Sequence, residues 1–162
     1  MEGEPLALLA VGLLLLQAAW CDFRWLKVPN RIPFLIVGLF PLSVALSGSD
    51  WHAAAIDHLA AGALVLAIGF GLFTLGKVGG ADAKLMASVS VWLGMPMLPS
   101  GLAAVAVSGS VLSVALFSLR RTSLPAWFAE RGLRLRALQP GLGAPYAVAI
   151  AAAFLWLECC SG

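Results

Sequence analysis

Leu59-Ala-Ala-Gly-Ala-Leu-Val-Leu-Ala-Ile-Gly-Phe-Gly-Leu-Phe-Thr-Leu75 contains no charged side chain. Its length approaches the roughly 20 residues that a helix needs to cross a lipid bilayer. Similar runs with few charges recur along the chain, at Leu6–Trp20, Ile32–Leu46, Leu85–Leu98, Gly101–Leu119 and Leu142–Leu157. We therefore predict an all-α, polytopic integral membrane protein with six transmembrane helices.

The composition agrees with this class. Of the 162 residues, 61% are hydrophobic and only 11% are charged, which leaves too few polar side chains to cover the surface of a soluble domain. Little polar sequence remains for a separate soluble domain or a nucleic-acid-binding patch. We expect one membrane-embedded domain spanning residues 1–162, with the lipid bilayer as its surroundings. The first run is expected to be a retained helix, because Glu2 and Glu4 precede it where a secretory signal needs basic residues.

The basic residues predict the orientation. Every lysine and arginine lies within Asp22–Arg31, Gly76–Lys84 or Arg120–Gln139, and the segments that alternate with these have none. Because basic loops are retained in the cytoplasm, these three segments are predicted to be cytoplasmic. Both termini, the Ser47–Asp57 loop and the Gly94–Ser100 loop are then expected outside.

Two acids fall at matching depths in this arrangement. Asp22 follows the first apolar run and Asp82 precedes the fourth, so both are expected at the cytoplasmic edge of the hydrocarbon. Two carboxylates brought together in a partly desolvated place do not both ionise easily, so one can serve as a base and the other as an acid. The alternative is that each is a solvated loop charge beside a basic residue.

Other polar residues give weaker signals. Gly76, Gly79 and Gly80 permit close approach of another chain, or merely turn the backbone between two helices. His52, Asp57 and His58 lie on the predicted outer face, where they are either solvated or a metal site. The three cysteines, Cys21, Cys159 and Cys160, lack metal-ligand spacing. No metal or other cofactor is expected.

Three short patterns resemble a known family. They are Asp22-x-Arg24-x-x-x-x-Pro29-Asn30, Gly79-x-x-Asp82-x-Lys84 and Pro145-Tyr146. Together they resemble the type IV prepilin peptidases, membrane aspartyl proteases of the glycine-x-glycine-aspartate class. The chain is most similar to the short members of Flp or tight-adherence systems, which lack a methyltransferase region. Ala81 stands where the family pattern has glycine, and it fits if the backbone there is extended or helical.

The resemblance implies an aspartic endopeptidase with Asp22 and Asp82 as the catalytic pair. It implies a substrate-binding or site-shaping role for the other motif residues, namely Arg24, Pro29, Asn30, Gly79, Gly80, Ala81, Lys84, Pro145 and Tyr146. The implied substrate is a prepilin or pseudopilin precursor, cleaved at the cytoplasmic face of the bacterial inner membrane just before its hydrophobic helix. A different reading is a non-enzymatic or degenerate membrane subunit of a pilus or secretion assembly system.

Overall fold

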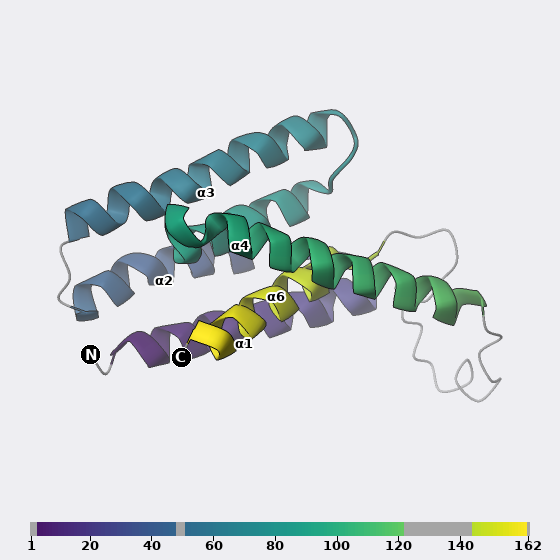
Figure 1. Ribbon diagram of the computed structural model, residues 1–162, viewed down its shortest axis with the longest axis horizontal. Coiled ribbons are helices and arrows are strands. Elements are labelled where there is room, and N and C mark those ends of the chain that lie inside the picture. Colours follow the sequence, from purple (N-terminus) through teal and green to yellow (C-terminus); the bar gives the residue numbers. More distant parts are fainter. Residues whose placement is uncertain (1–2, 48–50, 122–143, 162) are drawn as a thin grey trace.

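The computed structural model describes residues 3–47, 51–121 and 144–161, and all regular secondary structure in these ranges is helical. The helices, shown in Figure 1, are α1 (Gly3–Trp25), α2 (Arg31–Ser47), α3 (Trp51–Thr74), α4 (Gly80–Arg121) and α6 (Tyr146–Ser161). The all-α prediction is therefore confirmed for the described residues. The Arg120–Gln139 segment lies almost entirely outside them.

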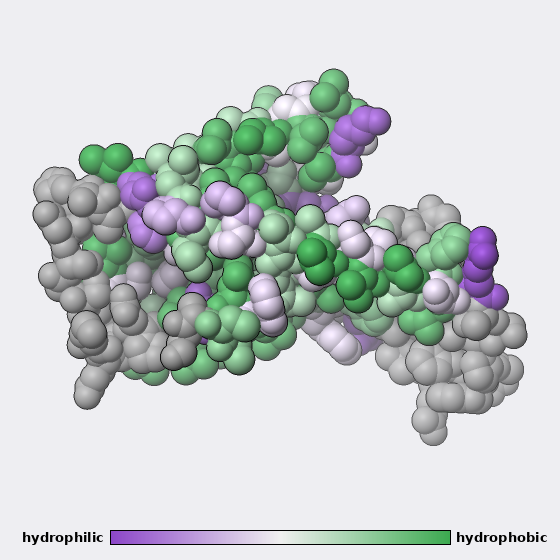
Figure 2. Space-filling model, in the orientation of Figure 1, coloured by the Kyte–Doolittle hydropathy of each residue, from purple (hydrophilic) through white to green (hydrophobic). Residues whose placement is uncertain are grey.

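Within the described residues, three helices are long and apolar enough to cross a membrane, judged by length and composition. These stretches are Leu6–Trp25, Ala55–Thr74 and Gly80–Leu119, while Arg31–Ala45 and Tyr146–Cys160 are shorter apolar helices. Figure 2 shows hydrophobic side chains over much of the described surface on this side of the molecule. The chain is thus a membrane protein, and the count of six spans stays a prediction.

Helix α4 is broken at Gly94, where the backbone angles are φ 67° and ψ 175°. Glycine tolerates this left-handed conformation because it has no Cβ. Figure 1 shows the chain folding back at this point, so that α4 consists of two halves. We predicted a loop over Gly94–Ser100, but the helix resumes almost at once, and Pro96 lies in its first turn, where a missing amide proton costs little.

Two side chains from α3 hold the Gly94 turn. Asp57 Oδ2 accepts a hydrogen bond of 3.1 Å from the amide of Met95, and His58 Nδ1 lies 2.7 Å from the carbonyl oxygen of Val91. Ser47–Asp57 was predicted as a loop, yet α3 begins at Trp51, so both residues are helical. Asp57 thus caps the beginning of the second half of α4, and His58 contacts a carbonyl oxygen in the last turn of the first half, which explains the polarity of both residues.

The buried core lies between α1, α2, the first half of α4 and α6. Its largest fully buried side chains include Leu15, Ile36, Leu85, Ile150 and Phe154. The indole of Trp92 also donates a 2.9 Å hydrogen bond to the carbonyl oxygen of Ile36, which ties α4 to α2. This packing holds the end of α1, the beginning of α4 and the beginning of α6 near one another.

The helix ends are divided between the two ends of the bundle. Figure 1 shows both termini at the end of the bundle where α2 ends and α3 begins, while the α3–α4 connection lies at the opposite end. Helix α1 ends at that opposite end, and α4 and α6 begin there. The three motif segments follow or form these helix ends.

Candidate active site

Asp22 lies in the last turns of α1 and is only 7% exposed. Its Oδ2 accepts a hydrogen bond of 3.0 Å from the backbone amide of Ala147, at the beginning of α6. Amides in the first turn of a helix have no acceptor within the helix, so this carboxyl supplies one. The contact places the predicted Pro145-Tyr146 motif directly beside Asp22.

Asp82 lies in the first turn of α4 and is partly buried. Its carboxyl is close enough to that of Asp22 for the two to interact electrostatically. The structure thus brings together the two acids that the sequence singled out, although they are 60 positions apart in the sequence. Neither is a freely solvated loop charge.

The turn between α3 and α4 is closed by backbone hydrogen bonds. The amide of Gly76 donates to the carbonyl oxygen of Phe73, and that of Lys77 donates to the carbonyl oxygen of Leu72, both at 2.9 Å. Gly76 has a φ of 67°, as is typical of a glycine that ends a helix. This glycine therefore turns the chain, as the simpler of the two sequence interpretations proposed.

Gly79 has a different role. A Cβ built on it would lie 2.7 Å from Oδ2 of Asp82, which is closer than real Cβ contacts. The amide of Ala83 also donates a 3.0 Å hydrogen bond to the Gly79 carbonyl oxygen, so the helix begins here. The absence of a side chain at Gly79 leaves room for the carboxyl of Asp82.

The next two positions pack against neighbours. A Cβ on Gly80 would lie 3.3 Å from Cε2 of Phe73, a tight contact. Ala81 lies in helix α4 and packs against the buried core cluster. Its backbone is helical, which is one of the two conformations that accommodate alanine in place of the family glycine.

Of the remaining motif residues, Pro145 is fully buried, while Arg24, Pro29, Asn30, Lys84 and Tyr146 are exposed. Lys84 Nζ donates a hydrogen bond of 3.4 Å to Oδ1 of Asn30, which joins the segment after α1 to the beginning of α4. Pro29 is exposed, and its carbonyl oxygen accepts a 3.1 Å hydrogen bond from the amide of Ile32 as α2 begins. Arg24 is exposed, with its guanidinium 5.2 Å from the centroid of the Trp25 ring.

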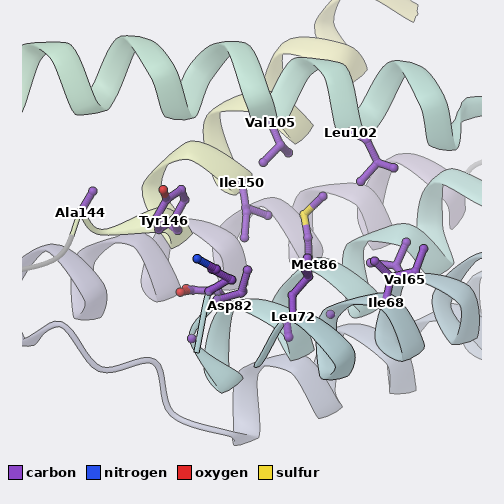
Figure 3. A pocket seen from close by; sticks show the side chains of 15 residues that line it. Val65, Ile68, Leu72, Asp82, Met86, Leu102, Val105, Ala144, Tyr146 and Ile150 are labelled. Carbon is purple, nitrogen blue, oxygen red and sulfur yellow. The ribbon is translucent and has the colours of Figure 1, made fainter. Parts of the chain in front are cut away.

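A cavity of about 460 Å³ opens beside Asp82. Figure 3 shows Asp82 and Tyr146 at one end of it, and Val65 and Leu102 toward the other. The sequence did not single out the apolar lining, because such residues look the same as those that face lipid. Sequence analysis also did not identify the Ala147 amide as a partner of Asp22. Pro145 is an indirect signal of it, since proline favours the beginning of a helix.

Comparison with curated proteins finds no match, and comparison with solved structures finds none either. The chain does match the model of the type IV leader peptidase family over residues 8–114. The matched region contains Asp22, the turn between α3 and α4, and Asp82, whereas Pro145 and Tyr146 lie beyond it. Since the match covers more than half of the sequence, the chain belongs to the type IV leader peptidase family.

Proposed function

We propose that this protein is an aspartic endopeptidase that removes the leader peptide from type IV prepilin-like precursors at the cytoplasmic face of the membrane. Membership of the leader peptidase family supports a protease. The observation that carries the aspartic class is the approach of the Asp22 and Asp82 carboxyls at one end of the helix bundle.

The proposed reaction uses the two carboxyls as a base and an acid. One, ionised, takes a proton from a water molecule whose oxygen attacks the scissile carbonyl carbon. The other, protonated, donates its proton to the carbonyl oxygen. When the carbon–nitrogen bond of the tetrahedral intermediate breaks, a proton passes to the departing amine and a new carboxyl group remains on the leader.

The surrounding motif residues support this pair by positioning. Ala147 holds one oxygen of Asp22 through its amide, and Gly79 leaves the space that Asp82 occupies. The Lys84–Asn30 hydrogen bond links the two segments that carry the acids. Arg24, Pro29, Gly80, Ala81 and Tyr146 complete the surroundings in this proposal.

The proposal includes the membrane arrangement. Six spans, with Gly94 between the fourth and fifth, would put both termini outside and the basic segments in the cytoplasm of a bacterial cell. Residues 1–162 would then form one domain in the inner membrane. The position of the α3–α4 connection at the end opposite to the termini supports this topology (Figure 1).

Conversion of each acid to its amide tests the function. Asp22→Asn and Asp82→Asn retain the shape of the side chain but cannot exchange protons in the same way, so each should abolish processing of a co-expressed precursor. The double variant should be no worse than either single variant, because the two residues act as one unit.

Asp57→Asn is the matched control, because an amide oxygen can still accept the Met95 hydrogen bond at the far end of the bundle. Glu130→Gln, outside the described residues, should also retain cleavage. Near-normal processing by either single active-site variant would refute the aspartic mechanism. A wild-type protein that processes no pilin-like precursor would point instead to a non-enzymatic subunit of an assembly system.

A further inference from the structure

The cavity beside Asp82 is built by segments from α3 onward. Both halves of α4 contribute to it, together with α3, the turn that follows α3, and the beginning of α6. The residues that line it are Val65, Ile68, Gly69, Leu72, Lys77, Val78, Gly79, Asp82, Ala83, Met86, Leu102, Val105, Ala144, Tyr146 and Ile150. Its volume of about 460 Å³ falls within the range of ligand sites, roughly 300–1,000 Å³.

The cavity has a polar end and an apolar end. Asp82 and Tyr146 lie together at one end in Figure 3, and Lys77 also contributes to the wall. From Leu72 to Val65 the lining on α3 extends about 10 Å away from the turn, at about 1.5 Å per residue. The ligand that fits must therefore present a polar, reacting group beside an apolar body.

The polar end of the cavity bears on two apolar occupants. A phospholipid would bring an anionic headgroup that Asp82 repels and Lys77 attracts, so the wall offers it no clear net electrostatic gain. A peptide instead brings a neutral amide to Asp82 and apolar side chains to the rest of the wall. A basic leader segment fits the cavity poorly, because the lining is apolar except at Asp82 and Lys77 and would leave the basic side chains without polar partners.

We propose that this cavity is the subsite for the first apolar side chains that follow the scissile bond, and that its width selects among them by size. This assignment rests on the proposed peptidase function and deepens it. Leu102 and Val105 set the width: in Figure 3 both point from the second half of α4 toward Met86 on the first half. A larger side chain at either position narrows the cavity without touching Asp22 or Asp82.

Narrowing variants test the selection by size. Leu102→Phe and Val105→Phe should each lower kcat/KM for a precursor with Phe after the scissile bond far more than for the same precursor with Ala there. The ratio of the two kcat/KM values should fall about tenfold or more, since small differences in an apolar pocket change discrimination by roughly 10–200-fold. Two positions are used because Val105 also packs against the core.

Val107→Phe is the matched control, because Val107 lies on the same helix, is 65% exposed and does not line the cavity. It should leave the Phe-to-Ala ratio unchanged. The assignment of the cavity as this subsite is wrong if both Leu102→Phe and Val105→Phe leave the Phe-to-Ala ratio unchanged. It is also wrong if Val107→Phe shifts the ratio equally.

A second measurement does not depend on cleavage. A precursor with a photoreactive leucine analogue after the scissile bond is irradiated with the Asp22→Asn variant, in which the cavity wall is intact. Adducts within residues 65–72 or 102–105 are expected. Adducts confined to the outward side of α4 at Val107, Val111 or Val114, or no adducts at all, overturn the subsite. Adducts in the cavity without cleavage by the wild-type protein would refute the peptidase function while keeping the binding site.

Discussion

Asp22 and Ala147 are joined by a 3.0 Å hydrogen bond between the carboxyl of one and the backbone amide of the other, across 125 positions of sequence. The bond connects the last turns of α1 to the first turn of α6. It fixes one member of the acid pair from a segment that lies beyond the region matched by the family model.

Removal of the Asp22 side chain should destabilise the fold. Asp22→Ala leaves the buried amide of Ala147 without an acceptor, at a cost of about 1–3 kcal/mol, whereas the oxygen of Asn in Asp22→Asn can still accept the bond. Thermal unfolding in detergent should show a lower Tm for the alanine variant and a nearly unchanged Tm for the asparagine variant. Equal Tm values for the two variants would show that the bond contributes nothing.

Gly79 should be intolerant of a side chain. Gly79→Ala places a methyl group 2.7 Å from Oδ2 of Asp82, so the carboxyl must move. Displacement of a catalytic group by about 1 Å can cost on the order of a hundredfold in rate, and we expect a large loss of kcat in precursor cleavage. Gly71→Ala is the control, because a Cβ there meets nothing within 4 Å. Similar kinetics for the two variants would contradict the crowding argument.

Gly94 should be needed for stability rather than for chemistry. At φ 67° and ψ 175° an alanine is strained by about 1–3 kcal/mol, and its Cβ would also lie 2.7 Å from Oδ2 of Asp57. Gly94→Ala should therefore lower the Tm in detergent more than Gly38→Ala, for which a Cβ finds open space. If Gly94→Ala unfolds at the wild-type temperature, the turn is more adaptable than described.

The orientation is tested with single cysteines in a protein whose native Cys21, Cys159 and Cys160 have been replaced by alanine. Lys77→Cys, in the turn before the candidate site, should react with an impermeant thiol reagent only after permeabilisation. Met97→Cys, just beyond the Gly94 turn, should react in intact cells. Both positions are exposed in the structure, and the reverse pattern would place the acid pair outside the cytoplasm.

Sequence alone was sufficient for the helical class, and it singled out the two acids that the structure places at the same end of the bundle. Apolar runs and the positions of Asp22 and Asp82 are local properties of the chain, and they remain recognisable without any contact. The glycine at Gly79 was also found from its pattern, although its reason became visible only beside the Asp82 carboxyl.

The parts that sequence did not predict depend on contacts between distant residues. The predicted Gly94–Ser100 loop is wrong because Asp57, 38 positions earlier, caps the Met95 amide and lets the helix resume. The cavity was missed because Met86, Leu102 and Val105 have the same chemistry as lipid-facing residues. Only their arrangement around Asp82 sets them apart.

The dependence of Asp22 on α6 has a consequence for the timing of synthesis. Of the described helices, α6 is made last, so a nascent chain that has already inserted α1 to α4 still lacks the amide of Ala147. It also lacks the part of the cavity wall formed by Tyr146 and Ile150. If the proposed peptidase function is right, a growing chain would hold both acids in the membrane before the site is complete, so activity would begin only after α6 has been made.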